Sequence, residues 1–281
     1  MSRGQAGPDP PLPGPGLPAG FIWPADSGRA LLKRVPFTEV VPRGDLVGRQ
    51  GLDDGSGTSD ILLFKAGGWC LKTSLRRRFA DVETGRAALL ALVRKKRLLE
   101  TFLAPETVVA VVPEDTSDGA RSAWLWTVCP WWPSLRQQMA AAVEQRHEAA
   151  LASSLAAYAT AAVEAMLIAA RRQVQLDVHP SNFALTPGGL WYLDDDIGLA
   201  PTLPAIGHAL LQRVEEYGKW SAAVDIYLAA LEEALASRLS ALDVQTLGLA
   251  ETVEQTTVRS AVAEAARTRL RRAIWRCRPA P

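Results

Sequence analysis

The chain of 281 residues contains few of the residues that build metal centres or covalent cross-links, with only three cysteines and three histidines. The cysteines are far apart in sequence, so they form neither a CxxC metal pair nor a disulfide framework. Three scattered histidines exclude an HExxH zinc helix and multi-histidine metal sites. Such cysteine usage is typical of proteins in a reducing compartment, and we therefore expect a cytoplasmic protein.

The chain also lacks an excess of charge of either sign. It has 31 basic and 30 acidic residues and a net charge of +1, which excludes a field over the whole molecule that would hold nucleic acid or an anionic membrane. We find no apolar run of about 18 residues and no signal peptide, so no transmembrane segment is expected. Hydrophobic residues at 48% and charged residues at 22% are typical of a globular protein.

Composition divides the chain into three parts. Residues 1–20 contain six prolines and five glycines, which predicts a disordered tail. Residues 21–130 have short apolar runs separated by Gly, Pro or Asp, with one helix expected over 79–99 and a hairpin turn at Gly67 and Gly68. Residues 131–281 are mostly helix formers. The predicted fold class is therefore α+β, with a small sheet-rich part before a larger helical part.

An acidic and amide-rich segment interrupts the helical half, in VQLDVHPSNFALTPGGLWYLDDDIGLA. Asp177 is followed five residues later by Asn182, and a strand-like LWYL then leads to Asp194, Asp195 and Asp196. Phosphoryl transfer from ATP needs a carboxylate that orients the attacking hydroxyl and oxygen ligands that hold magnesium against the phosphates. This segment contains both kinds of group. The alternative is that Asp177 and Asn182 only satisfy loop N–H groups as Asx turns do.

The sequence DVHPSN resembles the D-x-H-P-x-N catalytic loop of the protein-kinase-like superfamily, in particular the branch of aminoglycoside and choline phosphotransferases. The resemblance implies a two-lobed kinase-like fold that binds ATP and Mg²⁺. It implies Asp177 as the catalytic aspartate, Asn182 as a magnesium ligand and one aspartate of the DDD run as the second ligand. Spacing from Asn182 favours Asp195, a preceding hydrophobic residue favours Asp194, and the DIGLA segment favours Asp196.

The resemblance extends upstream in the expected order. Lys72 in WCLKT is similar to the strand lysine that contacts the nucleotide phosphates, and Glu83 to its partner on a helix. Gly55 and Gly57 resemble a glycine-rich phosphate loop, and the backbone around Val128 to Pro130 resembles the hinge that binds adenine. Taken alone, the lysine and the glutamate are typical of surface positions at a strand end and on a helix face.

Several departures from the family pattern bear on function. Asp60 stands where a third glycine would complete the phosphate loop, and Gln175 and Leu176 replace the His-Arg that precedes the catalytic aspartate in protein kinases. The sequence therefore predicts an atypical phosphotransferase that moves the γ-phosphoryl group to a hydroxyl of an unidentified small molecule or protein. Two alternatives stay open: a pseudokinase-like interaction module, and a nucleotidylyl transferase on the same fold.

Basic residues gather at the C-terminal end, where residues 265–281 hold six arginines and no acid. Such a run is usually a solvated helix face. We expect this helix to dock on the helical half through Leu270, Ile274 and Trp275, with contact to a partner as the alternative.

Overall fold

The computed structural model describes residues 21–35, 61–99, 102–115, 121–198 and 206–277. It divides into two compact units, the sheet unit (1–94 and 104–131) and the helical unit (95–103 and 132–281). The division at 131 falls one residue from the boundary expected from composition, but the sequence did not predict that 95–103 belongs to the helical unit. The expected tail at 1–20 lies outside the described residues.

The sheet unit contains a six-stranded antiparallel sheet in the order β1-β5-β6-β3-β2, with β4 also paired to β6. The strands are β1 (Ile22–Trp23), β2 (Ile61–Ala66), β3 (Trp69–Ser74), β4 (Arg78–Phe79), β5 (Val108–Asp115) and β6 (Arg121–Pro130). The expected hairpin is confirmed: Gly67 and Gly68, with φ of 52° and 83°, form the turn between β2 and β3. Both conformations are ones that glycine adopts without steric cost.

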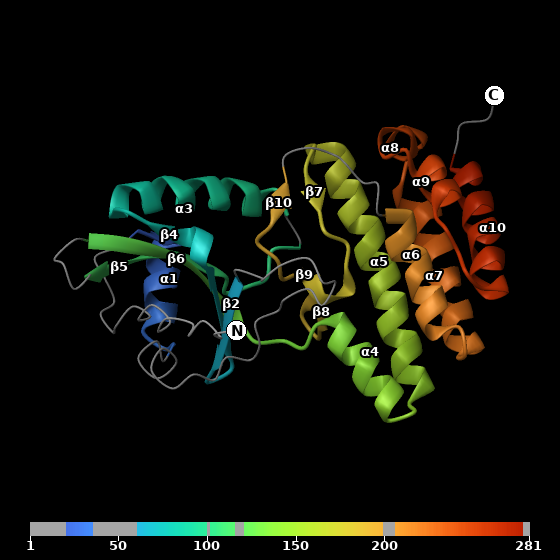
Figure 1. Cartoon of the computed structure of the whole chain (residues 1–281), viewed down its shortest axis with the longest axis horizontal. Coiled ribbons are helices and arrows are strands. Elements are labelled where there is room, and N and C mark those ends of the chain that lie inside the picture. Colours follow the sequence, from blue (N-terminus) through green and yellow to red (C-terminus); the bar gives the residue numbers. More distant parts are fainter. Residues whose placement is uncertain (1–20, 36–60, 100–101, 116–120, 199–205, 278–281) are drawn as a thin grey trace, which may run out of the picture. The chain divides into compact units, whose positions relative to one another are not determined.

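Two helices, α1 (Ala25–Leu32) and α3 (Val82–Arg97), cover opposite faces of this sheet (Figure 1). Side chains alternate along β5: Val108 and Ala110 pack with Leu31 of α1, whereas Val109 and Val111 pack with Leu89 of α3. The sequence predicted α3 but not α1. The eight residues of α1 include Gly28, whose low helix propensity hides so short a helix from a reading of periodicity.

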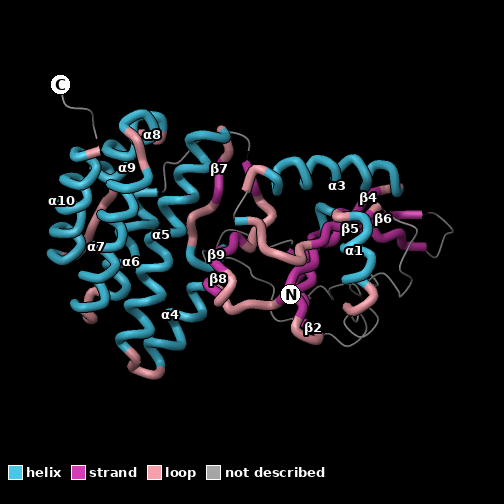
Figure 2. The backbone as a smooth tube through the Cα atoms, turned by 180° about the vertical axis from the view of Figure 1, so that it is seen from behind, coloured by secondary structure: helices cyan, strands magenta, loops and turns pink. Residues whose placement is uncertain are grey.

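The helical unit contains seven α-helices among its described residues (Figure 2). They are α4 (Leu135–Glu144), α5 (Glu148–Arg172), α6 (Ile206–Tyr217), α7 (Ser221–Arg238), α8 (Ala241–Thr246), α9 (Leu249–Gln255) and α10 (Ala261–Arg276). Four short strands lie between α5 and α6: β7 (Gln175–Leu176), β8 (Phe183–Thr186), β9 (Gly189–Tyr192) and β10 (Ile197–Gly198). The acidic segment thus forms two small antiparallel pairs, β7 with β10 and β8 with β9.

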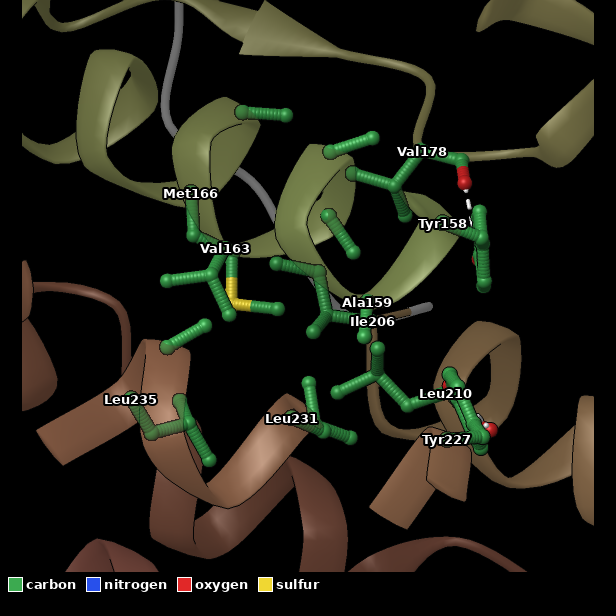
Figure 3. Close-up of a cluster of buried hydrophobic side chains, with 14 of the residues drawn as sticks. Tyr158, Ala159, Val163, Met166, Val178, Ile206, Leu210, Tyr227, Leu231 and Leu235 are labelled. Atoms are coloured by element: carbon green, nitrogen blue, oxygen red, sulfur yellow. Dashed lines mark hydrogen bonds between the residues drawn. The ribbon is translucent and has the colours of Figure 1, made fainter. Parts of the chain in front are cut away.

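Helix α5 is the centre of the helical unit. It packs on α4 and α7, and its side chains Ala159, Val163 and Met166 meet Leu231 and Leu235 of α7 in one core (Figure 3). By length and a mean hydropathy of 1.5 α5 would also pass as a membrane span, which the sequence analysis did not expect. The core helix of a soluble protein passes the same test, and 61% of the apolar window of α5 is buried.

Helix α10 docks through two of the three expected residues, and the assignment of Trp275 to the docking stripe was wrong. Leu270 and Ile274 are buried in the core of the helical unit, whereas Trp275 is 60% exposed. Arg269 makes two hydrogen bonds to Glu232 of α7, and Arg271 pairs with Glu254 of α9 at 2.7 Å. These arginines of the C-terminal run therefore bind acids of the same unit, and a contact with another partner stays a prediction.

Candidate functional site

The register of the two short strand pairs brings the predicted polar residues together. Leu176 of β7 pairs with Ile197 of β10, so Asp177 and Asp196 leave this pair at the same end. Phe183 pairs with Tyr192 in the same way, which places Asn182 beside the segment that leads to Asp194. The N–H of Leu193 donates to the carbonyl of Asn182 at 2.7 Å and extends this pair by one step.

Hydrogen bonds within the loop fix the position of Asp177. Its Oδ1 accepts the backbone N–H of His179 at 3.0 Å, and its carbonyl accepts Nδ2 of Asn182 at 3.2 Å. Its own N–H donates to the hydroxyl oxygen of Tyr192 at 3.2 Å. These are the Asx-type contacts expected of a tight loop, and they leave the carboxylate of Asp177 on the surface.

Tyr192 lies at the centre of the acidic groups. Burial raises the pKa of its phenol, and the charges of Asp194, Asp177 and Asp196 raise this pKa further. These three carboxylates come from separate strand ends, and the strand register independently places Asp177 beside Asp196. The ring of Tyr192 packs edge-on against Phe183, with ring centroids 5.3 Å apart, and so anchors the cluster in the core.

Tyr158 of α5 makes a hydrogen bond that holds the loop on this helix. Its hydroxyl donates to the carbonyl of Val178 at 2.8 Å, directly after Asp177 (Figure 3). The phenol is fully buried, and burial raises its pKa well above the ordinary value. The residue also stacks on Tyr227, which donates to the carbonyl of Leu210 in α6 at 2.9 Å. A rigid aromatic layer thus links the candidate loop to three helices.

His179 takes a structural position in this loop. Its Nδ1 accepts the N–H of Ser181 at 3.3 Å and lies 2.7 Å from the Ser181 hydroxyl oxygen. Burial lowers the pKa of the imidazole, and the charges of Arg213 and Arg136 lower it further against the opposing effect of Asp177.

Asp195 differs from the other two aspartates of the DDD run. Its Oδ1 lies 2.5 Å from Nζ of Lys96, and the two side chains are 1% and 3% exposed. Lys96 belongs to the basic run 94–97, a pattern usually typical of a solvated helix face, but its side chain is buried. Helical spacing could have predicted the burial of Lys96. The lysine lies on the same face of α3 as the buried residues Leu89, Leu92 and Val93.

The residues that converge fit a hard cation such as Mg²⁺. Asn182 uses Nδ2 for the carbonyl of Asp177, which leaves its oxygen as a ligand, and Asp196 is exposed next to half-buried Asp194. Among the described residues no cluster of three or more His, Cys, Asp or Glu side chains could hold a metal ion. Magnesium does not require one, because it is typically bound through one or two carboxylates together with substrate phosphates and water.

Lys72 and Glu83 are both in the sheet unit, and the structure does not pair them. Glu83 is 74% exposed and pairs with Arg86 in the same helix at 3.4 Å. Lys72 is paired across the strands with Thr127, whereas the start of α3 packs at Gly85 over Val111 and Ala123. Ala123 and Thr127 are four positions apart on β6, a distance of about 13 Å at the usual rise. In this structure Glu83 pairs with Arg86 rather than with Lys72, and the assignment of the two residues to a nucleotide site stays a prediction.

Within the expected hinge, Val128 itself is part of the sheet, whereas Cys129 and Pro130 pair with β3 but not with β5. Val128 is fully buried and pairs with Val108 of β5 on one side and Leu71 of β3 on the other, so its backbone belongs to the sheet. A backbone enclosed by two neighbouring strands has no N–H or C=O to offer to adenine. Gly55 and Gly57 of the expected phosphate loop lie outside the described residues.

Comparison with known proteins does not identify the chain. No family model matches it, and no curated protein matches it. The case for its function therefore depends on the loop itself.

Proposed function

We propose that the protein is an ATP- and Mg²⁺-dependent phosphotransferase with a kinase-like catalytic loop. The observation that supports this most directly is the register of the two short strand pairs, which places Asp177 beside Asp196 and Asn182 beside the segment that leads to Asp194. Acids brought together at a loop are unfavourable for folding, because like charges repel. A site that binds a metal-chelated polyphosphate gives that arrangement a use.

In this proposal Asp177 orients the acceptor hydroxyl. Its Oδ1 is held by the N–H of His179, and Oδ2 accepts the hydroxyl hydrogen. The hydroxyl oxygen then forms a bond to the γ-phosphorus, the bond from that phosphorus to the bridging oxygen breaks, and ADP leaves with the electron pair. The hydroxyl proton passes to the carboxylate. Fixing the angle of attack is the main contribution of such a group.

The metal assignment follows from the burial of Asp195. Because Asp195 is used by Lys96, we assign the magnesium ligands to Asn182, Asp194 and Asp196. Bound Mg²⁺ would neutralise charge on the transferred phosphoryl group. Lys72 stays a candidate for contact with the phosphates. Tyr192 and Tyr158 hold the loop in place through hydrogen bonds to the backbone of Asp177 and Val178.

Incubation with Mg-ATP and a panel of hydroxyl compounds and proteins, followed by mass spectrometry of the products, tests the proposal. We expect a phosphoryl adduct and ADP, and the Asp177→Asn variant should lose about a hundredfold or more in turnover. Asp225→Asn is the matched control, since this carboxylate is 74% exposed on α7. An adenylyl adduct would favour nucleotidylyl transfer, and undiminished turnover in the Asp177 variant would refute the role of that residue.

A second candidate function is an interaction module that keeps the fold without the chemistry. It is favoured by Glu83, which pairs with Arg86, and by Asp195, which pairs with Lys96. An interaction module of this kind can keep nucleotide binding, so product formation separates the two: for this candidate we expect neither a phosphoryl nor an adenylyl product with Mg-ATP.

A further inference from the structure

A pocket of about 370 Å³ opens beside the candidate loop in the helical unit. It is lined by residues of α4, the loop and α6: Arg136, His179, Gln212, Arg213, Glu215 and Glu216. The N–H of His179 is bound to the carboxylate of Asp177, so the pocket adjoins the group that we assign to the acceptor hydroxyl.

The pocket contains a guanidinium group that is buried but incompletely paired. The side chain of Arg213 is 2% exposed, and its Nη1 pairs with Oε2 of Glu216 at 2.7 Å. Its Nε is buried and, within the described part of the chain, has no hydrogen-bond partner. A buried charged donor without a partner is costly, so this guanidinium group has unused hydrogen-bonding capacity next to the pocket.

Two further donors line the same pocket. Arg136, in the first turn of α4, is exposed and forms no ion pair with any residue that the structure describes. The Nδ1 atom of His179 accepts the N–H of Ser181, so the ring proton is on Nε2. Both guanidinium groups and the imidazole are thus hydrogen-bond donors.

The two acids of the pocket are already compensated. The carboxylate of Glu215 accepts the N–H groups of Arg259 and Ser260 at 2.6 Å and 3.1 Å, where α10 begins. These bonds, with that from Arg259 the strongest, lower the pKa of Glu215. Glu216 pairs with Arg213. The groups of the pocket that can still bind a ligand are therefore its N–H donors.

We propose that this pocket binds an anionic oxygen group, a carboxylate or a phosphate, of the molecule that carries the acceptor hydroxyl. The term acceptor depends on the proposed phosphotransferase function, whereas binding of an anion here does not. A guanidinium group binds either anion through paired N–H donors. The pocket thereby selects acidic acceptors over neutral or cationic ones.

Ligand binding to the full-length protein without ATP tests this inference independently of catalysis. The probes are glycerate, glycerol 3-phosphate, glycerol and ethanolamine, which share a hydroxyl and differ in charge. Binding is measured by saturation-transfer NMR and by titration calorimetry. We expect glycerate, glycerol 3-phosphate or both to bind, and neither glycerol nor ethanolamine to do so. The anion that binds more tightly shows whether the pocket prefers a carboxylate or a phosphate.

Arginine variants locate the binding site. Arg136→Gln should weaken binding of the anion about tenfold, as expected for loss of a charge-assisted hydrogen bond. Arg272→Gln, which changes an exposed arginine of α10, should leave it unchanged. Arg213→Lys keeps the buried charge but loses the planar guanidinium group, and it should also weaken binding. The inference is overturned if neither anion binds at 10 mM, if ethanolamine binds equally well, or if Arg136→Gln has no effect.

Discussion

Lys96 and Asp195 form an ion pair that is almost wholly removed from solvent, within one unit of the chain. A buried pair adds little net stability over an apolar pair of the same size, but loss of one partner leaves the other charge without compensation. This pair fixes the middle of the DDD run and so directs its two neighbours to other positions.

Lys96→Met and Asp195→Leu should each lower the free energy of unfolding by about 3 to 5 kcal/mol. The double variant should recover most of that loss, because it removes both charges from the core. Urea unfolding of the three variants measures the effect. Losses that simply add in the double variant would show that the two residues do not interact.

The hydroxyl of Tyr158 makes a hydrogen bond that holds the candidate loop on α5. Tyr158→Phe keeps the ring and its stacking on Tyr227 but leaves the carbonyl of Val178 without this donor. We expect a loss of about 1 kcal/mol in the free energy of unfolding. Faster amide exchange confined to 177–182 would be the second sign, and unchanged exchange there would contradict the role of this bond.

At the scale of single residues, the sequence was informative where the signal was local. The spacing of Asp177 and Asn182 belongs to one loop, and the structure brings these two residues together through a hydrogen bond. The contacts of the loop with Lys96, Tyr192 and Arg213 depend on tertiary packing, so no local sequence pattern predicts them. Glu83 was assigned from order alone, and order does not fix which turn of a helix faces a given strand.

Helix α6 approaches α9 closely at Gly207. A Cβ atom built at this position would lie 2.5 Å from the carbonyl oxygen of Thr252 and 2.5 Å from the hydroxyl of Thr256. Helix propensity alone would make Gly207→Ala stabilising by about 1 kcal/mol. We expect Gly207→Ala to destabilise the protein instead, because the carbonyl of Thr252 cannot move aside without separating α6 from α9. A thermal melt decides between them, and a raised midpoint would contradict the packing.

Helix α8 is capped by an acid that also binds α5. Burial acts to raise the pKa of Asp243, but hydrogen bonds from Ser240 and Arg171 outweigh it, so the pKa lies below its ordinary value of 3.8. A lowered pKa in the folded state stabilises the protein above the unfolded value, and this contribution disappears as the pH falls through the folded value.

Asp243→Asn should therefore lower the free energy of unfolding by about 1 kcal/mol at neutral pH. The difference from the unchanged protein should shrink as the pH is lowered below about 4. Urea unfolding at a series of pH values measures it. A difference that is independent of pH would show that the charge of Asp243 does not contribute.

At the scale of elements, periodicity and turn chemistry predicted α3, the β2–β3 hairpin and the helical second half. The signal failed for short elements. Helix α1 has eight residues and contains Gly28, and β7 and β10 have two residues each. Such elements are stabilised by the core around them rather than by their own propensities.

At the scale of the whole molecule, the composition predicted two parts of different character, and the structure has a sheet unit and a helical unit. The transfer of the short segment 95–103 to the helical unit was not predictable from composition, since it lies at the end of α3 and depends on contacts such as Lys96 with Asp195. The proposed function depends on the side chains of one loop, and a measurement of nucleotide binding tests it directly.

The thermal midpoint of the full-length protein with ATP, in the presence and absence of Mg²⁺, is the most direct measurement. A ligand at 100 times its dissociation constant adds about 2.7 kcal/mol, which should raise the midpoint by about 5 °C or more. We expect this shift only with Mg²⁺, and we expect Asn182→Ala or Asp194→Ala to abolish it while Asp225→Asn keeps it. An absent shift, or an equal shift in all variants, would contradict the account.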